Sequence, residues 1–198
     1  MLLLASQSPR RRELLKLLDI PFRIVEIKDV KEEYDENLTP DQIPLYLSKL
    51  KAEAYVGELK DDDILITADT VVALGERVLG KPSGSEDAKR MLRELSGRTH
   101  KVITGVTLST RKTSVTFSSV TEVKFSELSD EAINYYVDRY KPFDKAGAYG
   151  IQEWIGAVGI ESIKGSYYNV MGLPVHRLHK ELLPFIHLLP ELSPRNGI

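Results

Sequence analysis

The chain has 198 residues, 42% of them hydrophobic, which is enough to bury the core of one large domain or of two closely packed lobes. Its formal net charge of −2 argues against a surface that binds long polyanions, so a local basic cluster indicates a small anionic ligand. Because the chain contains no cysteine, disulfides, thiolate metal ligands and a cysteine nucleophile are excluded.

We expect a cytoplasmic protein that binds neither a membrane nor a nucleic acid. No apolar stretch approaches the length of a membrane span, and the short apolar run at the N-terminus precedes its arginines, the reverse of a secretory signal. No basic stripe interleaved with aromatic residues is found in the sequence, which argues against a nucleic-acid-binding module.

The chain begins with a strand, a turn and a helix. Residues 2–5 predict a short buried strand, Ser8 is a candidate helix N-cap, and Pro9 takes the first helical position. The first helical turn is basic and consists of Arg10, Arg11 and Arg12. Since a helix N-terminus already carries partial positive charge, a bound anion such as phosphate would explain this turn. A solvated basic turn is the alternative.

A second strand (22–27) and a mostly acidic loop (28–37) precede the next predicted helix. Two acidic residues of the loop are relevant below, Glu32 and Glu33. The helix opens at Thr39 and carries Lys51. On this pattern alone, Lys51 is most simply a solvated lysine.

Residues 64–74 form the most apolar stretch of the chain and predict a central strand. Asp69 interrupts this stretch. Burying an ionised carboxylate without a partner costs on the order of several kcal/mol of desolvation free energy. Asp69 is therefore either a structural carboxylate with a partner at a strand end, or a metal ligand or general base on a rigid strand.

The next elements alternate between strands and helices. After turns at 75–77 and 80–82, Ser85 is expected to cap a helix that runs to about residue 96. Residues 99–110 and 114–125 predict a long β-hairpin, and Ser129 caps a further helix. This alternation predicts an α/β fold with a mixed sheet.

The last part of the chain is rich in glycine. Residues 143–154 contain Lys145 and Gln152 and predict a ligand-facing loop, with a tight connection as the alternative. A strand (157–163), a loop (165–172) and a terminal helix that starts at Leu173 complete the prediction.

Six motifs in this order resemble the Maf family of nucleoside triphosphate pyrophosphatases. They are SQSPRR (6–11), KA (51–52), ADT (68–70), GKP (80–82), KAGAYGIQ (145–152) and GSY (165–167) with GLP (172–174). Each motif is weak alone, but together they cover nearly the whole chain, from residue 2 to about residue 179. The resemblance implies an inosine-triphosphatase-like fold: an elongated mixed sheet flanked by helices, in one domain (1–188) of two lobes with a central cleft, followed by a C-terminal tail (189–198).

The resemblance also implies the reaction, which is hydrolysis of a nucleoside triphosphate to the monophosphate and pyrophosphate with a divalent cation, Mg²⁺ or Mn²⁺. Water attacks the α-phosphorus, and the charge of the triphosphate must be neutralised for this attack to occur. A homodimer is implied as well. A nucleotide-binding regulator of cell division with little turnover is the rival, because the family is associated with inhibition of septum formation.

Site residues follow from the same resemblance. Asp69 is similar to the catalytic carboxylate, as base or as metal ligand, and Lys51 and Lys81 to the lysines that face the triphosphate. Glu32 is the expected second metal ligand, with Glu33 as the alternative because the loop departs from the family pattern. The expected substrate-binding residues are Ser8, Arg10, Arg11, Thr70, Lys145 and Gln152, whereas Arg12 is expected to be solvated.

Three positions favour the dTTP/UTP branch of the family over its 7-methyl-GTP branch. Arg10, Thr70 and Gln152 stand where the second branch tends to carry Trp, Gln and Glu. A Gln amide can pair with the donor and acceptor edge of uracil or thymine, whereas Glu accepts hydrogen bonds from guanine. The sequence therefore predicts dTTP and UTP as substrates, and modified pyrimidine triphosphates as further substrates. The alternative substrate is 7-methyl-GTP.

Overall fold

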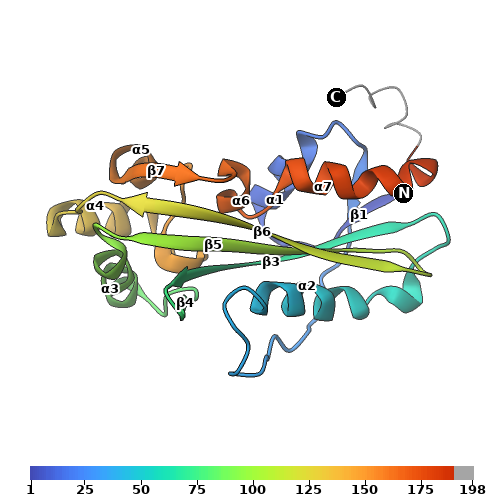
Figure 1. The fold of residues 1–198 in the computed structure, drawn as a ribbon, viewed down its shortest axis with the longest axis horizontal. Helices are drawn as coiled ribbons and strands as arrows, with labels where there is room; N and C mark the ends of the chain where they lie inside the picture. The colour runs from blue at the N-terminus through green and yellow to red at the C-terminus, as the bar shows by residue number, and fades with distance from the viewer. Residues whose placement is uncertain (190–198) are drawn as a thin grey trace. The chain divides into compact units, whose positions relative to one another are not determined.

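The computed structural model describes residues 1–189, so the predicted tail lies outside the described residues except for Leu189. Seven strands form a mixed sheet in the order β2-β1-β3-β5-β6-β7, with β4 paired to β3 (Figure 1). The strands are β1 (Leu2–Leu4), β2 (Phe22–Ile24), β3 (Ile64–Leu74), β4 (Arg77–Leu79), β5 (Thr99–Ser109), β6 (Ser114–Phe125) and β7 (Ile160–Lys164). The predicted α/β class with a mixed sheet is thereby confirmed.

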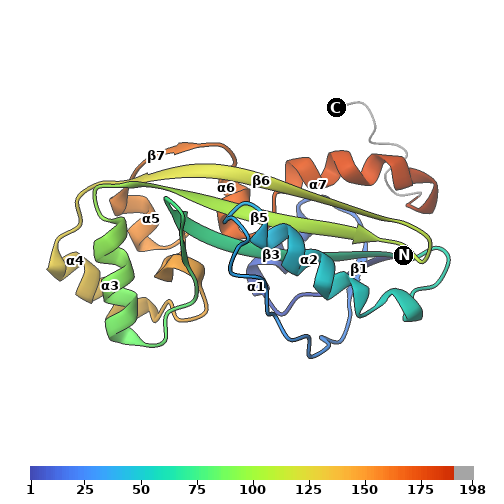
Figure 2. The same ribbon diagram turned by 60° about the horizontal axis from the view of Figure 1, so that its bottom comes forward.

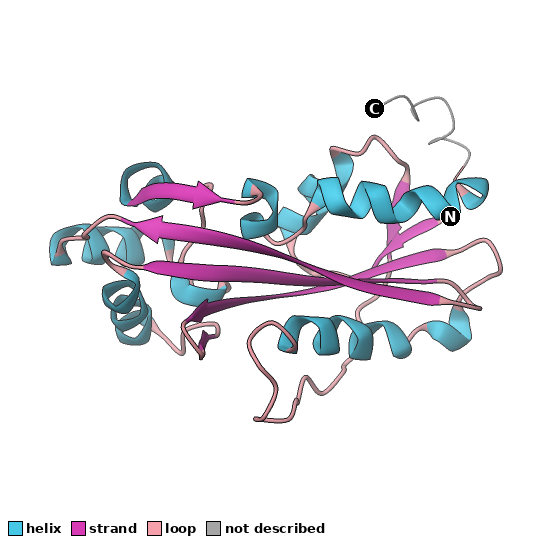
Figure 3. Ribbon diagram, viewed as in Figure 1, coloured by secondary structure: helices cyan, strands magenta, loops and turns pink. Residues whose placement is uncertain are grey.

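Helices lie in several of the connections between these strands and after the last strand (Figure 3). They are α1 (Pro9–Lys16), α2 (Ile43–Glu53), α3 (Ser85–Leu95), α4 (Asp130–Tyr140), α5 (Trp154–Gly159), α6 (Tyr167–Met171) and α7 (Val175–Leu182), with short 3₁₀ turns η1 (Val56–Glu58), η2 (Ala146–Ala148) and η3 (Leu183–Leu188). Among residues 1–189, no helix combines the length and the apolar character needed to cross a membrane.

The chain divides into two compact units. The first contains residues 1–69, residues 104–119 and the described residues from Gly172 onward. The second contains residues 70–103 and 120–171. The strands β3, β5 and β6 each contribute residues to both units.

In the first unit, β1 lies between β2 and β3 and pairs parallel with both. Its side chains Leu2 and Leu4 are completely buried, as expected for a strand with a neighbour on each side and an apolar sequence. Helices α2 and α7 lie on opposite faces of these strands (Figure 1). At Gly105, a Cβ would lie 2.2 Å from the Pro44 carbonyl oxygen, so only glycine allows α2 to approach β5 this closely.

In the second unit, α3 and α4 pack side by side (Figure 2). Their apolar faces join side chains of β3, β5 and β6 in one hydrophobic core, whose largest fully buried members include Leu92, Phe125 and Tyr136. The strand β7 pairs antiparallel with β6 and has a register irregularity between Lys124 and Phe125.

Some predicted elements were misplaced. Ser85 was expected to cap α3, but it is the first residue of the helix and Gly84 is the N-cap. The strand expected at 157–163 begins only at Ile160, because residues 154–159 form the helix α5. The expected loop at 165–172 contains the short helix α6. Helix α2 begins at Ile43 rather than at Thr39, because the Gln42 side chain accepts a hydrogen bond from the Thr39 N–H at 3.0 Å and holds residues 39–42 in a turn.

Candidate active site

The first turn of α1 has the predicted cap. Ser8 is the N-cap, and its Oγ accepts a hydrogen bond from the Arg11 N–H at 3.4 Å. Pro9 follows at the first helical position, and no acidic residue lies in the first turn. The positive end of this helix therefore has Arg10, Arg11 and Arg12 beside it and no acidic side chain of its own.

Arg11 points into the protein. Its Nε donates to the Gly172 carbonyl and its Nη1 to the Ala68 carbonyl, both at 2.8 Å. Burial lowers the pKa of Arg11, while the negative charges of Asp69 and Glu32 act in the opposite direction. Since Ala68 directly precedes Asp69, this guanidinium fixes the backbone from which Asp69 projects.

The expectation that Arg12 is solvated was wrong. The residue is half-buried, its Nε is buried without a hydrogen-bond partner among the described residues, and its Nη2 lies 3.5 Å from the Ser6 carbonyl oxygen. Arg10 is also half-buried, and its positive charge lies close enough to Arg11 to contribute to lowering the pKa of Arg11.

The Thr67 hydroxyl group fixes helix α2 on strand β3. Thr67 donates to the Ser48 carbonyl at 2.7 Å, and both residues are completely buried. Alternate residues of a strand point to the same face, so Asp69 faces α2 as Thr67 does. Lys51 lies three residues after Ser48, close to one helical turn, and is thereby brought opposite Asp69.

Lys51 lies between two carboxylates. Its Nζ is 2.7 Å from Asp69 Oδ1 and 3.0 Å from Glu32 Oε2. The Asp69 side chain is 14% exposed, whereas that of Glu32 is 51% exposed. Glu33 instead pairs with Lys31 and does not share this cluster. We call Glu32, Lys51 and Asp69 the Lys51 cluster.

The Lys51 cluster fits a divalent cation. Two carboxylates, from β3 and from the loop before α2, converge on one cationic group, the ammonium of Lys51. Carboxylate oxygens are the ligands that Mg²⁺ and Mn²⁺ prefer, and water and phosphate oxygens complete their coordination. Among residues 1–189, no group of three or more His, Cys, Asp or Glu residues could hold a metal by itself. Any ion here would therefore depend on ligands from the substrate and solvent.

A second lysine between two carboxylates lies in the second unit. Lys145 Nζ is 2.8 Å from Asp144 Oδ1 and 3.1 Å from Glu153 Oε1. The Tyr136 hydroxyl donates to the other oxygen of Glu153 and accepts from the Gly150 N–H at 3.0 Å. Burial and the negative charge of Glu153 raise the pKa of Tyr136 far above its usual value, so this hydroxyl stays a donor. We call these four side chains the Lys145 cluster.

The other predicted residues of the second unit lie near its surface. Lys81 and Gln152 are exposed, and Thr70 is half-buried in β3 next to Asp69. The Gly147 N–H donates to the Gly80 carbonyl at 3.1 Å, which joins the turn of Lys81 to the segment that follows Lys145. Among the described residues, Lys81 has no hydrogen bond or ion pair, so its ammonium is available to an anion.

Sequence reasoning missed Glu153, Asp144 and Tyr136. An acidic residue directly after Gln152, in a segment otherwise poor in charge, was the one signal for Glu153. Tyr136 gave none, because a tyrosine on the apolar face of a helix resembles any core aromatic residue.

The fold and the site together define an α/β protein with a lysine held between two carboxylates beside its strand β3. Its fold is similar to the structure of the Staphylococcus aureus Ham1 protein, with a TM-score of 0.50 at 16% identity over 91% of this chain and 97% of that chain. The family model described as "Maf-like protein" matches residues 1–185. The chain therefore belongs to the Maf family.

Relatives of known name are similar over most of their length. A dTTP/UTP pyrophosphatase of Porphyromonas gingivalis is 55% identical over 186 residues, which cover 93% of this chain and 94% of the relative. A dTTP/UTP pyrophosphatase of Parabacteroides distasonis is 53% identical over 184 residues, which cover 93% of this chain and 95% of the relative.

Proposed function

We propose that this chain hydrolyses dTTP and UTP to the nucleoside monophosphate and pyrophosphate. The observation that carries the proposal is the Lys51 cluster, which holds a mostly buried carboxylate, Asp69, on a rigid apolar strand beside a lysine. The names of relatives that share half of the sequence or more support the same reaction and the same substrates.

In the proposed reaction, Asp69 orients the water that attacks the α-phosphorus and accepts its proton, and pyrophosphate leaves. Asp69 and Glu32 would hold the divalent cation, which supplies positive charge to the phosphate oxygens. Lys51 and Lys81 add positive charge that offsets the repulsion between the triphosphate and the incoming water. Arg11 donates a hydrogen bond to the carbonyl of Ala68. It therefore fixes the backbone that carries Asp69, in addition to supplying positive charge.

For substrate binding, we assign Ser8, Arg10 and Arg11 to the phosphates or the base, and Thr70, Lys145 and Gln152 to the nucleotide. Gln152 is exposed, and its amide can present both a donor and an acceptor to a pyrimidine base. Lys145 can contribute to binding only in competition with its carboxylate partners, Asp144 and Glu153.

The experiment is pyrophosphate release from a panel of nucleotides with Mg²⁺ or Mn²⁺. We expect UTP and dTTP to be hydrolysed with higher kcat/KM than 7-methyl-GTP, ATP or GTP, and chelation of the metal to abolish release. A preference for 7-methyl-GTP would overturn the substrate assignment. Nucleotide binding without any release would favour the regulator of cell division.

A homodimer in the cytoplasm is the assembly and location that we propose for this activity. Size-exclusion chromatography with light scattering measures the first directly, and cell fractionation the second.

A further inference from the structure

Glu32 lies on a loop without regular secondary structure, between β2 and α2 (Figure 3). A metal ligand on such a loop is useful only if the loop holds one position, because ordering it on binding would cost free energy. The contacts of the loop segment 26–32 therefore decide how well the Lys51 cluster is preorganised.

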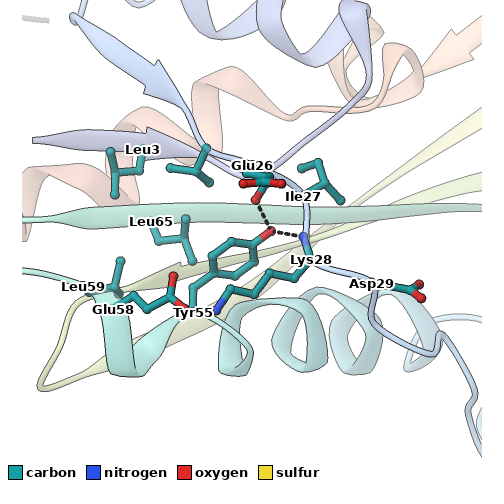
Figure 4. A pocket seen from close by; sticks show the side chains of 10 residues that line it. Leu3, Glu26, Ile27, Lys28, Asp29, Tyr55, Glu58, Leu59 and Leu65 are labelled. Atoms are coloured by element: carbon teal, nitrogen blue, oxygen red, sulfur yellow. Dashed lines mark hydrogen bonds and ion pairs between the residues drawn. The ribbon is translucent and has the colours of Figure 1, made fainter.

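The Tyr55 hydroxyl holds the start of this segment. It accepts a hydrogen bond from the Lys28 N–H at 2.9 Å and donates one to the Glu26 carbonyl at 3.0 Å (Figure 4). The ring is 6% exposed and belongs to a small hydrophobic cluster with Leu59 and Leu65. One core side chain thus fixes the backbone at two points of the loop.

The Lys28 side chain adds a second attachment to the same helix end. Its Nζ donates to the Ala54 carbonyl at 2.6 Å, pairs with Glu58 at 2.5 Å and lies 5.0 Å from the centre of the Tyr55 ring. Figure 4 shows this side chain running along the ring toward Glu58. A carbonyl at a helix C-terminus favours a cation, so this contact suits a lysine.

Both ends of the segment therefore attach to one stretch of chain. Lys51, which Glu32 contacts at 3.0 Å, lies four residues before Tyr55, about one helical turn. A cavity of about 470 Å³ lies beside Tyr55 and Lys28, so dense packing does not hold the loop on that side. The polar contacts have to hold it instead.

We propose that Tyr55 and Lys28 are positioning residues that hold Glu32 beside Lys51 and Asp69, and thereby set the affinity of the site for a divalent cation. Neither residue touches the reacting atoms in this account. We call the contacts through which Tyr55 and Lys28 hold the loop of Glu32 the Tyr55 tether. Its effect on catalysis rests on the proposed function, but its effect on metal binding does not depend on which substrate is hydrolysed.

Tyr55→Phe tests the proposal, because it keeps the ring and removes both hydrogen bonds. We expect Mn²⁺, added to the metal-free protein in a calorimetric titration, to bind about 10-fold more weakly, the size usual for an outer partner of a metal ligand. Amide exchange of segment 26–33 should be faster in the same variant. Tyr46→Phe is the matched control and should change neither, because Tyr46 lies in α2, is 44% exposed and has no hydrogen bond to its hydroxyl among the described residues.

A double-mutant cycle with Glu32→Gln separates positioning from general damage. If Tyr55 acts through Glu32, adding Tyr55→Phe to Glu32→Gln should weaken Mn²⁺ binding by less than about twofold more. The proposal would be overturned if the double variant lost Mn²⁺ affinity by the product of the two single-variant factors. It would also be overturned if Tyr55→Phe bound Mn²⁺ like the wild type. Lys28→Met, which keeps a side chain of similar length but removes the ammonium and its contacts, should give a smaller loss in the same direction and serves if Tyr55→Phe does not fold. A wild-type chain that releases no pyrophosphate from UTP would refute the proposed function alone, because Mn²⁺ binding and amide exchange still test the tether.

Discussion

Among the described residues, two lysines each have two carboxylates within 3.1 Å, one lysine in each unit, and the two clusters differ in what else holds their more buried carboxylate. In the Lys51 cluster one carboxylate, Glu32, is 51% exposed and comes from a loop. In the Lys145 cluster the outer carboxylate, Asp144, is 58% exposed as well. The inner carboxylates differ instead: Glu153, 19% exposed, also accepts a hydrogen bond from the completely buried Tyr136, whereas Asp69, 14% exposed, has no hydrogen-bond partner besides the lysine of its cluster among the described residues.

The difference shows how the same ion-pair chemistry can serve two purposes. A carboxylate with a buried hydroxyl partner is fixed, so the Lys145 cluster stabilises the segment that carries Gln152. Asp69 has only its ammonium partner among the residues that the structure describes, so its remaining oxygen lone pairs can bind a water or a cation. The Lys51 cluster is therefore the one suited to a reaction.

The largest expected effect concerns the Lys51 cluster. Asp69→Asn keeps the shape of the side chain but removes its charge and its capacity to accept a proton, so kcat should fall by about 10³-fold. Steady-state pyrophosphate release from UTP measures kcat, and the variant should still fold and bind the nucleotide. Turnover close to that of the wild type would remove Asp69 from the mechanism and leave the two clusters without a functional difference.

Acid should destabilise the interior of the second unit through His100. This residue is 2% exposed, and burial lowers its pKa from 6.5 to about 4. Above pH 6.5 the imidazole is neutral in both states. Between pH 6.5 and about 4 only the unfolded chain takes up the proton, so stability falls as the pH falls and levels off below about 4. Between pH 7 and pH 5 the loss should be about 2 kcal/mol.

Urea unfolding of the wild type and of His100→Gln at both pH values measures this contribution. The Gln amide can retain the hydrogen bond that His100 Nε2 makes with the Tyr149 hydroxyl at 2.7 Å. The variant should lose about 2 kcal/mol less than the wild type on acidification. An equal loss in both proteins would mean that His100 does not stay neutral in the folded chain.

Matched neutral substitutions compare the two clusters directly. Glu153→Gln removes charge from a nearly buried network and should lower the free energy of unfolding by about 2 kcal/mol. Glu32→Gln removes a half-exposed ion pair and should change it by less than about 0.5 kcal/mol. Urea titration followed by the fluorescence of the one tryptophan, Trp154, reports both values. Equal losses would show that burial and the Tyr136 hydroxyl do not make Glu153 more important for stability than Glu32.

Signals that lie close together in the sequence predicted the fold well. The Ser8 cap, the apolar strand that contains Asp69 and the hairpin at 99–125 each follow from residues within one element. The helix α5 did not, because a short run of glycine, alanine and valine fits a helix or a strand, and packing decides between them.

Contacts between distant residues account for what the sequence did not predict. Arg11 reaches the carbonyl of Gly172, 161 positions away, which no local pattern indicates. Asp69 was singled out by its place in an apolar strand, whereas Lys51 and Glu32 were assigned to the site only from family resemblance. The contact between Lys51 and Asp69 follows from how α2 is held on β3. The Tyr55 tether was missed because its hydrogen bonds reach backbone atoms, which any residue type provides.

Mn²⁺ binding to the metal-free protein, compared between Glu32→Gln and Glu153→Gln, is the most direct test of the difference between the clusters. We expect Glu32→Gln to weaken binding by about 10-fold or more, because it removes a ligand, and Glu153→Gln to bind within about twofold of the wild type. Equal weakening in the two variants, or weakening in Glu153→Gln alone, would contradict the assignment of the reaction to the Lys51 cluster.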